Sequence, residues 1–342
     1  MEQLINETII LNKMEAQKMK AIISTGYGGP EILQLQEVDK PIPKDHEVLV
    51  KIKSSSITTA ETMMRTGYPL IGRLFMGLFK PKNQISGTGF SGTIEAIGQH
   101  VRQFKLGDNV FGESLDTFGT YAEYICVGED GIIALKPDSL SHEEAAVVGD
   151  GPITSLNFLR NLGKINAHHR ILILGASGSL GTAAVQLAKY FGANVTGVCS
   201  AKNIELVRSL GADQVIDYNN EDFSSNGKTY DVIYDTIGVS SFSICKKSLT
   251  TYGVYLSPVL GIRLLFQMLF TSVFGTKKAR FAATGVLPHK VLRQYLQEIG
   301  QLMELGQMRS IISKRFSLEQ VQDAHRHIEE GHKIGNVVVN FR

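Results

Sequence analysis

Residues 171–181, ILILGASGSLG, have the spacing with the clearest chemical consequence in this chain. Their apolar start predicts a buried strand, and the residues after the glycines predict an amphipathic helix over 179–191. Gly175 permits a tight exit from the strand, Gly178 lets an anion approach the backbone, and Gly181 lets the helix pack closely on the strand. Because backbone N–H groups at a helix start bind phosphate, the pattern predicts a dinucleotide site.

The surroundings of the turn decide how specific this pattern is. Glycines also end strands for local reasons, so a purely structural turn is the alternative. A second strand predicted over 194–199 completes a strand–helix–strand unit and favours the nucleotide site.

The end of that second strand predicts which dinucleotide binds. NAD-specific sites place Asp or Glu there to accept hydrogen bonds from the adenine ribose. This chain has Ser200 and Lys202 instead, which could bind a 2′-phosphate, so NADPH is favoured over NADH. Lys202 could also be an ordinary solvated residue, and Tyr218 could flank the phosphate or simply end its strand. The cofactor-binding residues predicted from the turn and the strand ends are Gly175, Ala176, Ser177, Gly178, Ser179, Leu180, Gly181, Ser200, Lys202, Asn203 and Tyr218.

Composition limits the class of protein. Of 342 residues, 43% are hydrophobic and 20% charged, as in globular proteins, and a net charge of +2 with scattered basic residues does not suggest nucleic acid binding. Three separated cysteines argue against a disulfide framework and fit a reducing compartment, so we expect a cytoplasmic protein. Residues 1–18 lack a secretory signal pattern and are interpreted as an extension. The apolar run 259–274 is too short to span a membrane and predicts a surface helix or a subunit contact.

Two patterns of periodicity divide the chain. Residues 19–141 read as short strands between Gly, Pro and Asp breaks, which predicts a barrel-like antiparallel domain. From residue 142 helix and strand patterns alternate, beginning with a helix over 142–162, which predicts a doubly wound parallel sheet. We therefore predict an α/β protein in which a Rossmann domain, 142–286, is inserted in a catalytic domain, 19–141 and 287–342.

Long ordered stretches resemble a known family. GYGGPEILQLQEVDKPIPKDHEVLVKI, GTGFSGTIEAIGQHVRQFKLGDNVFG, LKPDSLSHEEAAVV, GASGSLGTAAVQLAKYFGANVTGVCSAKN and GHKIGNVVV are similar to the zinc-free quinone and enone reductases among the medium-chain dehydrogenase/reductases. The resemblance implies a GroES-like β-barrel domain, a Rossmann domain, an active site between them and a homodimer. It also implies that four residues lie near the nicotinamide half of the cofactor: Thr154, Thr236, Gly238 and Asn336.

Zinc-dependent members of that family supply thiolate, imidazole or carboxylate ligands at positions that here read Ser56-Ile57-Thr58-Thr59 and Gly87-Thr88-Gly89-Phe90. Neither stretch contains a cysteine, histidine or carboxylate, so no metal site is predicted. Asp150 departs from the segment usual in similar chains and is either functional or a tolerated substitution.

Without a Lewis acid, hydride addition to a conjugated carbon is the favoured chemistry, because an enolate or hydroquinone needs only a few hydrogen bonds. The candidate catalytic donors are Thr58, Thr59, Tyr68 and Tyr121, each with a structural alternative, and Glu61 is a possible proton relay. The sequence therefore predicts an NADPH-dependent, zinc-independent reductase of quinones or α,β-unsaturated carbonyls. An alcohol or aldehyde oxidoreductase and a non-catalytic NADPH-binding sensor of the same fold remain open.

Overall fold

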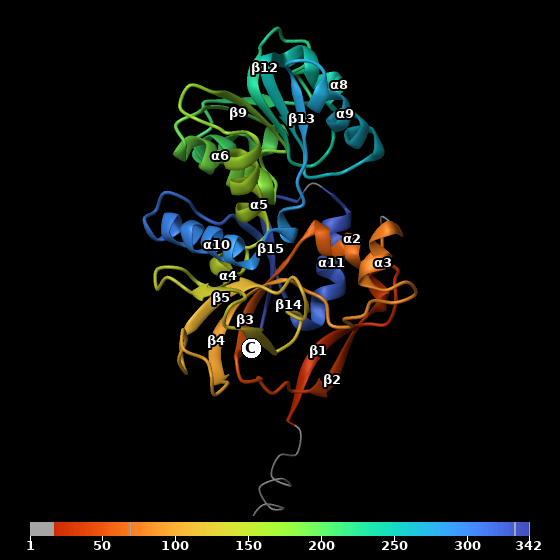
Figure 1. The fold of residues 1–342 in the computed structure, drawn as a ribbon, viewed down its shortest axis with the longest axis vertical. Helices are drawn as coiled ribbons and strands as arrows, with labels where there is room; N and C mark the ends of the chain where they lie inside the picture. Colours follow the sequence, from red (N-terminus) through yellow and green to blue (C-terminus); the bar gives the residue numbers. More distant parts are fainter. Residues whose placement is uncertain (1–16, 69, 332, 342) are drawn as a thin grey trace, which may run out of the picture.

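Two bodies stacked along the long axis make up the molecule in the computed structural model, which describes residues 17–68, 70–331 and 333–341 (Figure 1). The upper body contains a parallel sheet covered by helices, and the lower body contains a mixed sheet. The predicted α/β class, with a Rossmann-like sheet and a GroES-like domain, is confirmed.

The parallel sheet has the strand order β10-β9-β8-β11-β12-β13 in the described part of the chain. This is the doubly wound order 3-2-1-4-5-6, in which the strand order reverses beside the first strand while all strands stay parallel. Its strands are β8 (Arg170–Leu174), β9 (Asn194–Cys199), β10 (Gln214–Asp217), β11 (Tyr230–Asp235), β12 (Leu249–Leu256) and β13 (Lys278–Arg280). Because β8 is buried along its apolar residues, helices must cover both faces.

Helices on the two faces complete this body, with α6 directly after the glycine turn (Figure 1). They are α5 (Gly151–Asn157), α6 (Ser179–Tyr190), α7 (Ile204–Ser209), α8 (Phe242–Cys245) and α9 (Ile262–Val273). The predicted helix 179–191 is therefore confirmed to within a residue.

The predicted single helix over 142–162 is wrong. The structure has α4 (His142–Ala146), then α5, then a π-helical turn, Phe158–Leu162. The break lies at Asp150, which has non-helical backbone angles, and Pro152 begins the next helix. Gly149 at this break makes room for the Glu113 side chain, because a Cβ there would lie 2.3 Å from the Glu113 carboxyl.

The lower body is a sheet of order β14-β15-β3-β4-β5-β7, with β6 also paired to β3. Its strands are β3 (Glu47–Ile57), β4 (Gly89–Ile97), β5 (Asn109–Glu113), β6 (Tyr124–Gly128), β7 (Ile132–Leu135), β14 (Ile312–Ser317) and β15 (Asn336–Asn340). The hairpin of β1 (Lys18–Ser24) and β2 (Leu33–Asp39) lies beside it. The late strands β14 and β15 thus join the early sheet, as the predicted insertion requires.

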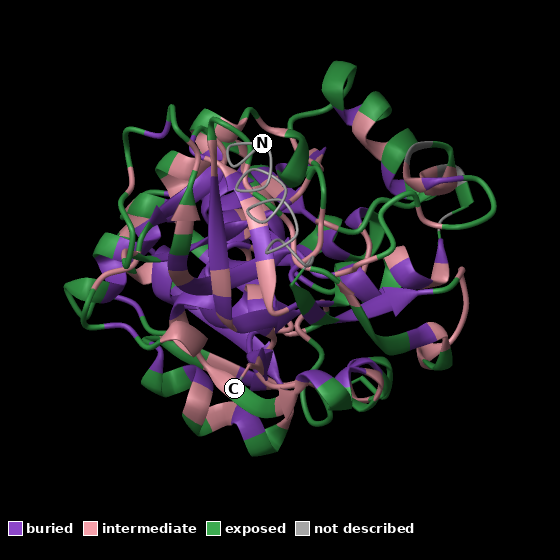
Figure 2. Ribbon diagram, turned by 90° about the horizontal axis from the view of Figure 1, so that it is seen from below, coloured by how far each residue is buried: buried purple, intermediate pink, exposed green. Residues whose placement is uncertain are grey.

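Four further helices border the lower body: α2 (Thr59–Thr66), α3 (Arg73–Met76), α10 (His289–Glu304) and α11 (Val321–Glu329). A hydrophobic cluster that includes Phe111, Phe158 and Leu296 joins the sheet faces of the two bodies. Figure 2 shows the buried strands at the centre and exposed helix faces around them. The core therefore continues across the junction and positions the two bodies relative to each other.

Candidate functional site

The glycine turn has the geometry that its three glycines predict. Gly175 has φ +73°, a left-handed value that glycine adopts readily. A Cβ on Gly181 would lie 2.1 Å from the Gly175 carbonyl oxygen, so α6 can pack this closely only with glycine there. A Cβ on Gly178 would meet only the Gly175 oxygen, at 3.4 Å, and would otherwise enter open space.

The start of α6 is free to bind an anion. Gly178 is its N-cap and supplies no side-chain hydrogen bond, so the first-turn N–H groups keep their donor capacity. A dinucleotide pyrophosphate matches this helix end and the open space above Gly178. Leu180 lies in the first turn, and Ala176 is buried with its N–H bonded to Val198 O (3.0 Å).

The end of β9 is tied to the turn. Asn203 Nδ2 donates to Ser177 Oγ (3.0 Å) and to Ser200 Oγ (3.3 Å), so Asn203 is buried and structural. Lys202 is exposed beside Ser200, and Tyr218 is 51% exposed with its N–H on Cys199 O. This edge thus presents one ammonium and two hydroxyl groups, and Ser200, Lys202 and Asn203 include no carboxylate.

The lead-in to the last strand also contacts the turn. Gly335 N donates to Ser177 O (2.8 Å), and Ser179 Oγ donates to Asn336 Oδ1 (2.6 Å). Asn336 Nδ2 donates in turn to Ile311 O (3.1 Å), so the amide is engaged within the protein. Its predicted direct contact with the cofactor stays a prediction.

The other residues expected near nicotinamide lie just after β11 and on α5. Thr236 Oγ1 donates to Leu174 O (2.7 Å) at the end of β8. Gly238 has φ +68°, and a Cβ there would meet Val259 at 2.9 Å. Thr154 lies half-buried on α5, and within the described chain its hydroxyl has no hydrogen bond.

On the lower side of the cleft, Glu61 is a buried hydrogen-bonding centre. Its Oε1 accepts from the Thr88 N–H (2.7 Å) and hydroxyl (3.1 Å), and its Oε2 accepts from Thr58 N (2.8 Å) and Tyr121 Oη (2.6 Å). Burial raises the pKa of Glu61, while these four bonds favour its carboxylate. Thr58 and Thr88, from the two stretches that hold the zinc ligands in zinc-dependent members, therefore both bond Glu61.

The structure separates the four candidate donors. Tyr121 is fully buried, and burial beside the Glu61 carboxylate raises its pKa well above the usual value, so its proton stays in the bond to Glu61. Thr58 Oγ1 accepts from Glu61 N, and its own proton has no acceptor among the described residues. Thr59 and Tyr68 are exposed, Tyr68 to 68%. Of the four, Thr58 is buried next to Glu61 and keeps a hydroxyl proton without an acceptor among the described residues.

Two further carboxyl groups, buried Glu113 and partly buried Asp150, and the amine of Lys333 interact electrostatically around this centre. Burial raises the pKa of Glu113, and the charges of Asp150 and Glu61 raise it further. Burial also raises the pKa of Asp150, opposed by Lys333, whose own pKa burial lowers. Glu113 is 8% exposed, and its carboxyl has no hydrogen-bond partner among the described side chains. Burial beside two other carboxyl groups therefore favours the protonated form of Glu113.

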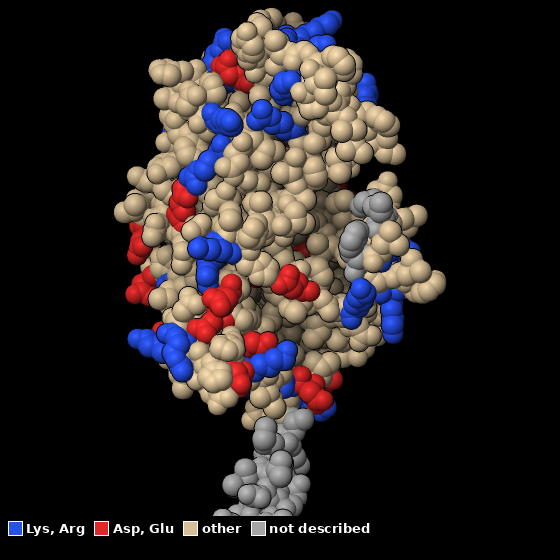
Figure 3. Space-filling model, in the orientation of Figure 1, with Lys and Arg blue, Asp and Glu red and all other residues tan. Residues whose placement is uncertain are grey.

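A cavity of about 460 Å³ opens next to Glu61. Its walls include Tyr27, Met64, Met76 and Phe118, which give it an apolar character with a polar end. Figure 3 shows the surface hollowed between the two bodies on this side of the molecule. The cavity is large enough for an aromatic ring or an unsaturated carbonyl compound.

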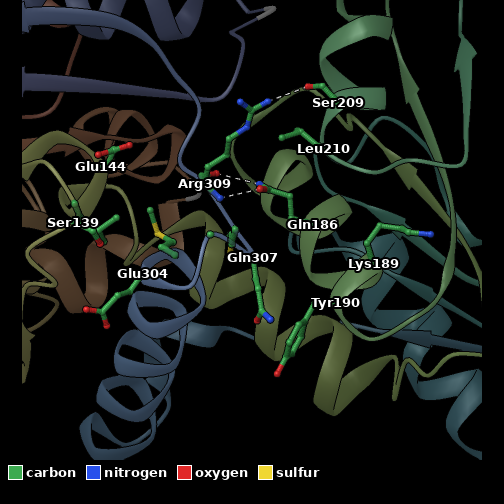
Figure 4. Close-up of a pocket in the computed structure, with 14 residues that line it drawn as sticks. Ser139, Glu144, Gln186, Lys189, Tyr190, Ser209, Leu210, Glu304, Gln307 and Arg309 are labelled. Atoms are coloured by element: carbon green, nitrogen blue, oxygen red, sulfur yellow. Dashed lines mark hydrogen bonds between the residues drawn. The ribbon is translucent and has the colours of Figure 1, made fainter.

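A larger cavity, about 710 Å³, lies at the other end of α6 (Figure 4). There Gln186 and Arg309 bond each other, Gln186 Oε1 accepting from Arg309 N (2.9 Å), and Arg309 also donates to Ser209 Oγ (3.0 Å). These contacts join the two bodies far from the glycine turn, so this crevice is structural.

Comparison with known proteins decides the family. Residues 44–138 match the family description "Alcohol dehydrogenase GroES-like domain", and residues 210–339 match "Zinc-binding dehydrogenase". Quinone-oxidoreductase QR1, chloroplastic, of Triphysaria versicolor is 31% identical over 340 residues, which cover 95% of this chain and 99% of that protein. The chain belongs to the quinone-oxidoreductase branch of the medium-chain dehydrogenase/reductases.

Two other members extend this assignment. NAD(P)H oxidoreductase RTN4IP1, mitochondrial, of Bos taurus is 32% identical, covering 94% of this chain and 89% of that protein. The solved quinone oxidoreductase of Coxiella burnetii has a TM-score of 0.84 and 28% identity, covering 95% of this chain and 100% of that one. As a member of this branch, the protein is an oxidoreductase of the NAD(P)H-dependent type.

The sequence reasoning missed two residues of the site. Glu113 ends β5 and Lys333 precedes β15, and neither belongs to a motif that predicts a role. Their convergence with Asp150 becomes visible only in the folded chain. The departure of Asp150 from the segment usual in similar chains was the one available signal.

Within residues 17–68, 70–331 and 333–341, no three His, Cys, Asp or Glu side chains are grouped to hold a metal ion. In the same residues, no helix is long and apolar enough to cross a membrane.

Proposed function

We propose that this member of the branch is an NADPH-dependent, zinc-independent reductase of quinones or α,β-unsaturated carbonyls. The observation that carries the proposal is the unobstructed glycine turn at the start of α6, in a chain whose other body has an apolar cavity beside Glu61 that is large enough for an aromatic ring. The name of QR1 supports a quinone as substrate.

The preference for NADPH rests on the end of β9. An exposed Lys202 next to Ser200 attracts a 2′-phosphate, and no carboxylate in this segment repels it. In NADH the same position carries a hydroxyl, which gains little from an ammonium. We therefore propose that Lys202 sets the cofactor preference.

NADPH, when bound, would supply the hydride. The turn and the first turn of α6 would hold the pyrophosphate, while Thr236, Gly238 and Thr154 would border the nicotinamide end. The Thr58 hydroxyl would donate to the carbonyl oxygen of the substrate and stabilise the charge that develops there. Glu61 orients Thr58 by accepting a hydrogen bond from its backbone N–H (2.8 Å).

Zinc independence rests on residue chemistry. The positions expected to bind zinc hold the hydroxyl side chains of Thr58 and Thr88, which are engaged around Glu61. Hydroxyl groups are poor ligands for zinc compared with thiolate or imidazole. A carbonyl conjugated with a double bond can instead be reduced with hydrogen bonds alone.

Three lesser proposals accompany this one. The catalytic domain would comprise residues 19–141 and 287–342, and the cofactor domain residues 142–286. Residues 1–18 would form an extension, of which the structure describes only Gln17 and Lys18, the first residue of β1. The protein would act in the cytoplasm as a homodimer. Analytical ultracentrifugation of the full chain tests the dimer.

One assay tests the function. NADPH absorbance is followed with ortho- and para-quinones, enals and simple aldehydes, with and without a chelator. We expect turnover of quinones or enals that is insensitive to the chelator. Loss of activity on chelation would contradict zinc independence. Turnover of simple aldehydes alone would favour alcohol and aldehyde chemistry, and tight NADPH binding without turnover would favour a sensor.

A further inference from the structure

An apolar stripe runs along the outward face of α9. Residues spaced three and four apart line it, with exposed fractions from 44% at Leu265 to 78% at Ile262. The stripe consists of Ile262, Leu265, Phe266, Leu269, Phe270 and Val273. The opposite face packs on the sheet through Leu264 and Met268. Both faces of α9 are therefore apolar, and the outer one has no covering element in the described chain.

A second apolar segment lies on the lower body, on the same side of the molecule as α9 (Figure 1). It includes Leu74, Leu78 and Phe79, and Phe79 is 87% exposed. We call this segment, residues 70–82, the α3 segment. Exposed patches of this kind mark interaction sites.

The charged residues within both segments and their flanking sequence have one sign. Residues 236–297 contain no Asp or Glu, although Lys246, Arg263 and Lys277 lie among them, and residues 62–94 contain none either. Arg263 and Lys246 are exposed and form no ion pair with any described residue. Figure 3 shows the edge of the upper body where α9 lies as uncharged and basic surface. The partner that matches this surface is apolar and anionic.

A trough of about 660 Å³ lies between α8 and α9. Phe242, Phe266, Phe270 and Phe274 line it, and Lys246 and Arg263 border it. An acyl chain with an anionic head group has this combination of apolar body and negative end.

We propose that α9 and the α3 segment dock the protein on an anionic lipid surface. At 12 residues α9 is roughly 18 Å long, too short to span a bilayer of about 30 Å, so it lies along the interface with its apolar stripe inserted. A second copy fits less well, because a two-fold contact brings each cationic patch against itself without carboxylates to pair.

Docking in this way places the cleft at the lipid surface. The α3 segment contributes Met76, Pro81 and Lys82 to the cavity beside Glu61. The loop before α9 contributes Val259, which contacts Gly238 at the cofactor side. Both docking segments therefore border the candidate site, and a lipid-dissolved substrate reaches it without crossing water. Docking itself does not depend on the proposed reaction.

The chain has no tryptophan, so Phe270→Trp introduces a single fluorescent reporter in the stripe. We expect a blue shift of its emission with vesicles of phosphatidylcholine and phosphatidylglycerol, weakening with added salt, and a smaller shift with phosphatidylcholine alone. Leu305→Trp, on an exposed residue at the end of α10, is the matched control and is expected to show no shift.

Vesicle co-sedimentation of the full chain supplies the second measurement. Phe266→Ser with Phe270→Ser is expected to reduce the fraction bound to anionic vesicles by about tenfold or more, whereas Leu305→Ser leaves it unchanged. Both side chains are exposed, so folding is expected to survive, and turnover of a water-soluble quinone checks this.

Two results would overturn the proposal. Wild-type protein that fails to bind anionic vesicles at low salt excludes docking. If the tryptophan emission of the Phe270→Trp variant is already blue-shifted without lipid, in a dimer that the double serine variant dissociates, the stripe belongs to a contact with a second copy. Failure of quinone reduction would leave vesicle binding intact, so the two proposals fail separately.

Discussion

Alanine at Gly178 and at Gly181 should damage different properties of the protein. Gly178 has φ −79° and ψ −178°, which any residue adopts, and its added Cβ has no neighbour closer than 3.4 Å. We expect Gly178→Ala to change the free energy of unfolding by less than about 1 kcal/mol. The methyl group would enter the space proposed for the pyrophosphate and remove at least one charge-assisted hydrogen bond, worth about 1.5–3 kcal/mol. Affinity for NADPH should fall roughly 10- to 150-fold.

Gly181→Ala provides the contrast. Its Cβ would lie 2.1 Å from the Gly175 oxygen and 2.7 Å from the Ala176 Cα, both backbone atoms that move only with the turn. Overpacking of this kind costs about 1–3 kcal/mol of folding free energy. Urea unfolding of the cofactor-free proteins and titration of NADPH by its fluorescence measure the two effects. Wild-type affinity in Gly178→Ala would refute the assigned position of the pyrophosphate.

Four other substitutions test the cofactor preference, the buried carboxyl group Glu113, the buried cation Arg65 and the hydroxyl donor Thr58. Lys202→Ala should weaken NADPH binding about tenfold and leave NADH binding unchanged, as measured by paired titrations of the two cofactors. An equal loss of affinity for NADPH and NADH would show that Lys202 does not select the 2′-phosphate. Because the raised pKa of Glu113 means that folding favours its protonated form, this residue makes the free energy of unfolding fall as pH rises above the ordinary carboxyl pKa, by about 1.4 kcal/mol per unit of pKa difference. Glu113→Gln should make this fall smaller, and identical pH profiles of urea unfolding in the two proteins would contradict the assignment. Arg65→Met should cost about 3–5 kcal/mol of folding free energy, because buried Arg65 donates to Glu329, Gly28 and His325; a loss below about 1 kcal/mol in thermal unfolding would show that these contacts are weak. Thr58→Val should lower kcat for quinones about tenfold or more while NADPH affinity stays constant, whereas Thr59→Val, at an exposed neighbour, should alter neither.

Local signals made the fold of the glycine turn predictable. The apolar strand β8, the glycines and the amphipathic α6 lie in one short stretch, so the sequence order is also the spatial order. The polar end of β9 is readable for the same reason, since parallel neighbours end at one edge of the sheet. What the sequence did not reveal is that Asn203 serves the turn itself by bonding Ser177.

The substrate half was less predictable because its residues come from distant segments. Glu61, Glu113, Asp150 and Lys333 are brought together by two bodies that meet at a cleft, and no periodicity links them. The break in the helix at Asp150 was missed for the same reason: it lies where the Glu113 side chain, from a distant segment, occupies the space beside Gly149. Tyr121 was a reasonable candidate from its context, yet only its bond to Glu61 shows where its proton goes.

The contact of Gly335 and Asn336 with the glycine turn has a consequence for biosynthesis. Residues 177 and 179 leave the ribosome long before residues 335 and 336, which provide their hydrogen-bond partners. A nascent chain can therefore form the parallel sheet and still lack part of the wall beside the turn. The hydrogen bonds between the turn and the last strand form only when β15 arrives, so any ligand that needs this completed wall would stabilise finished chains over partly synthesised ones.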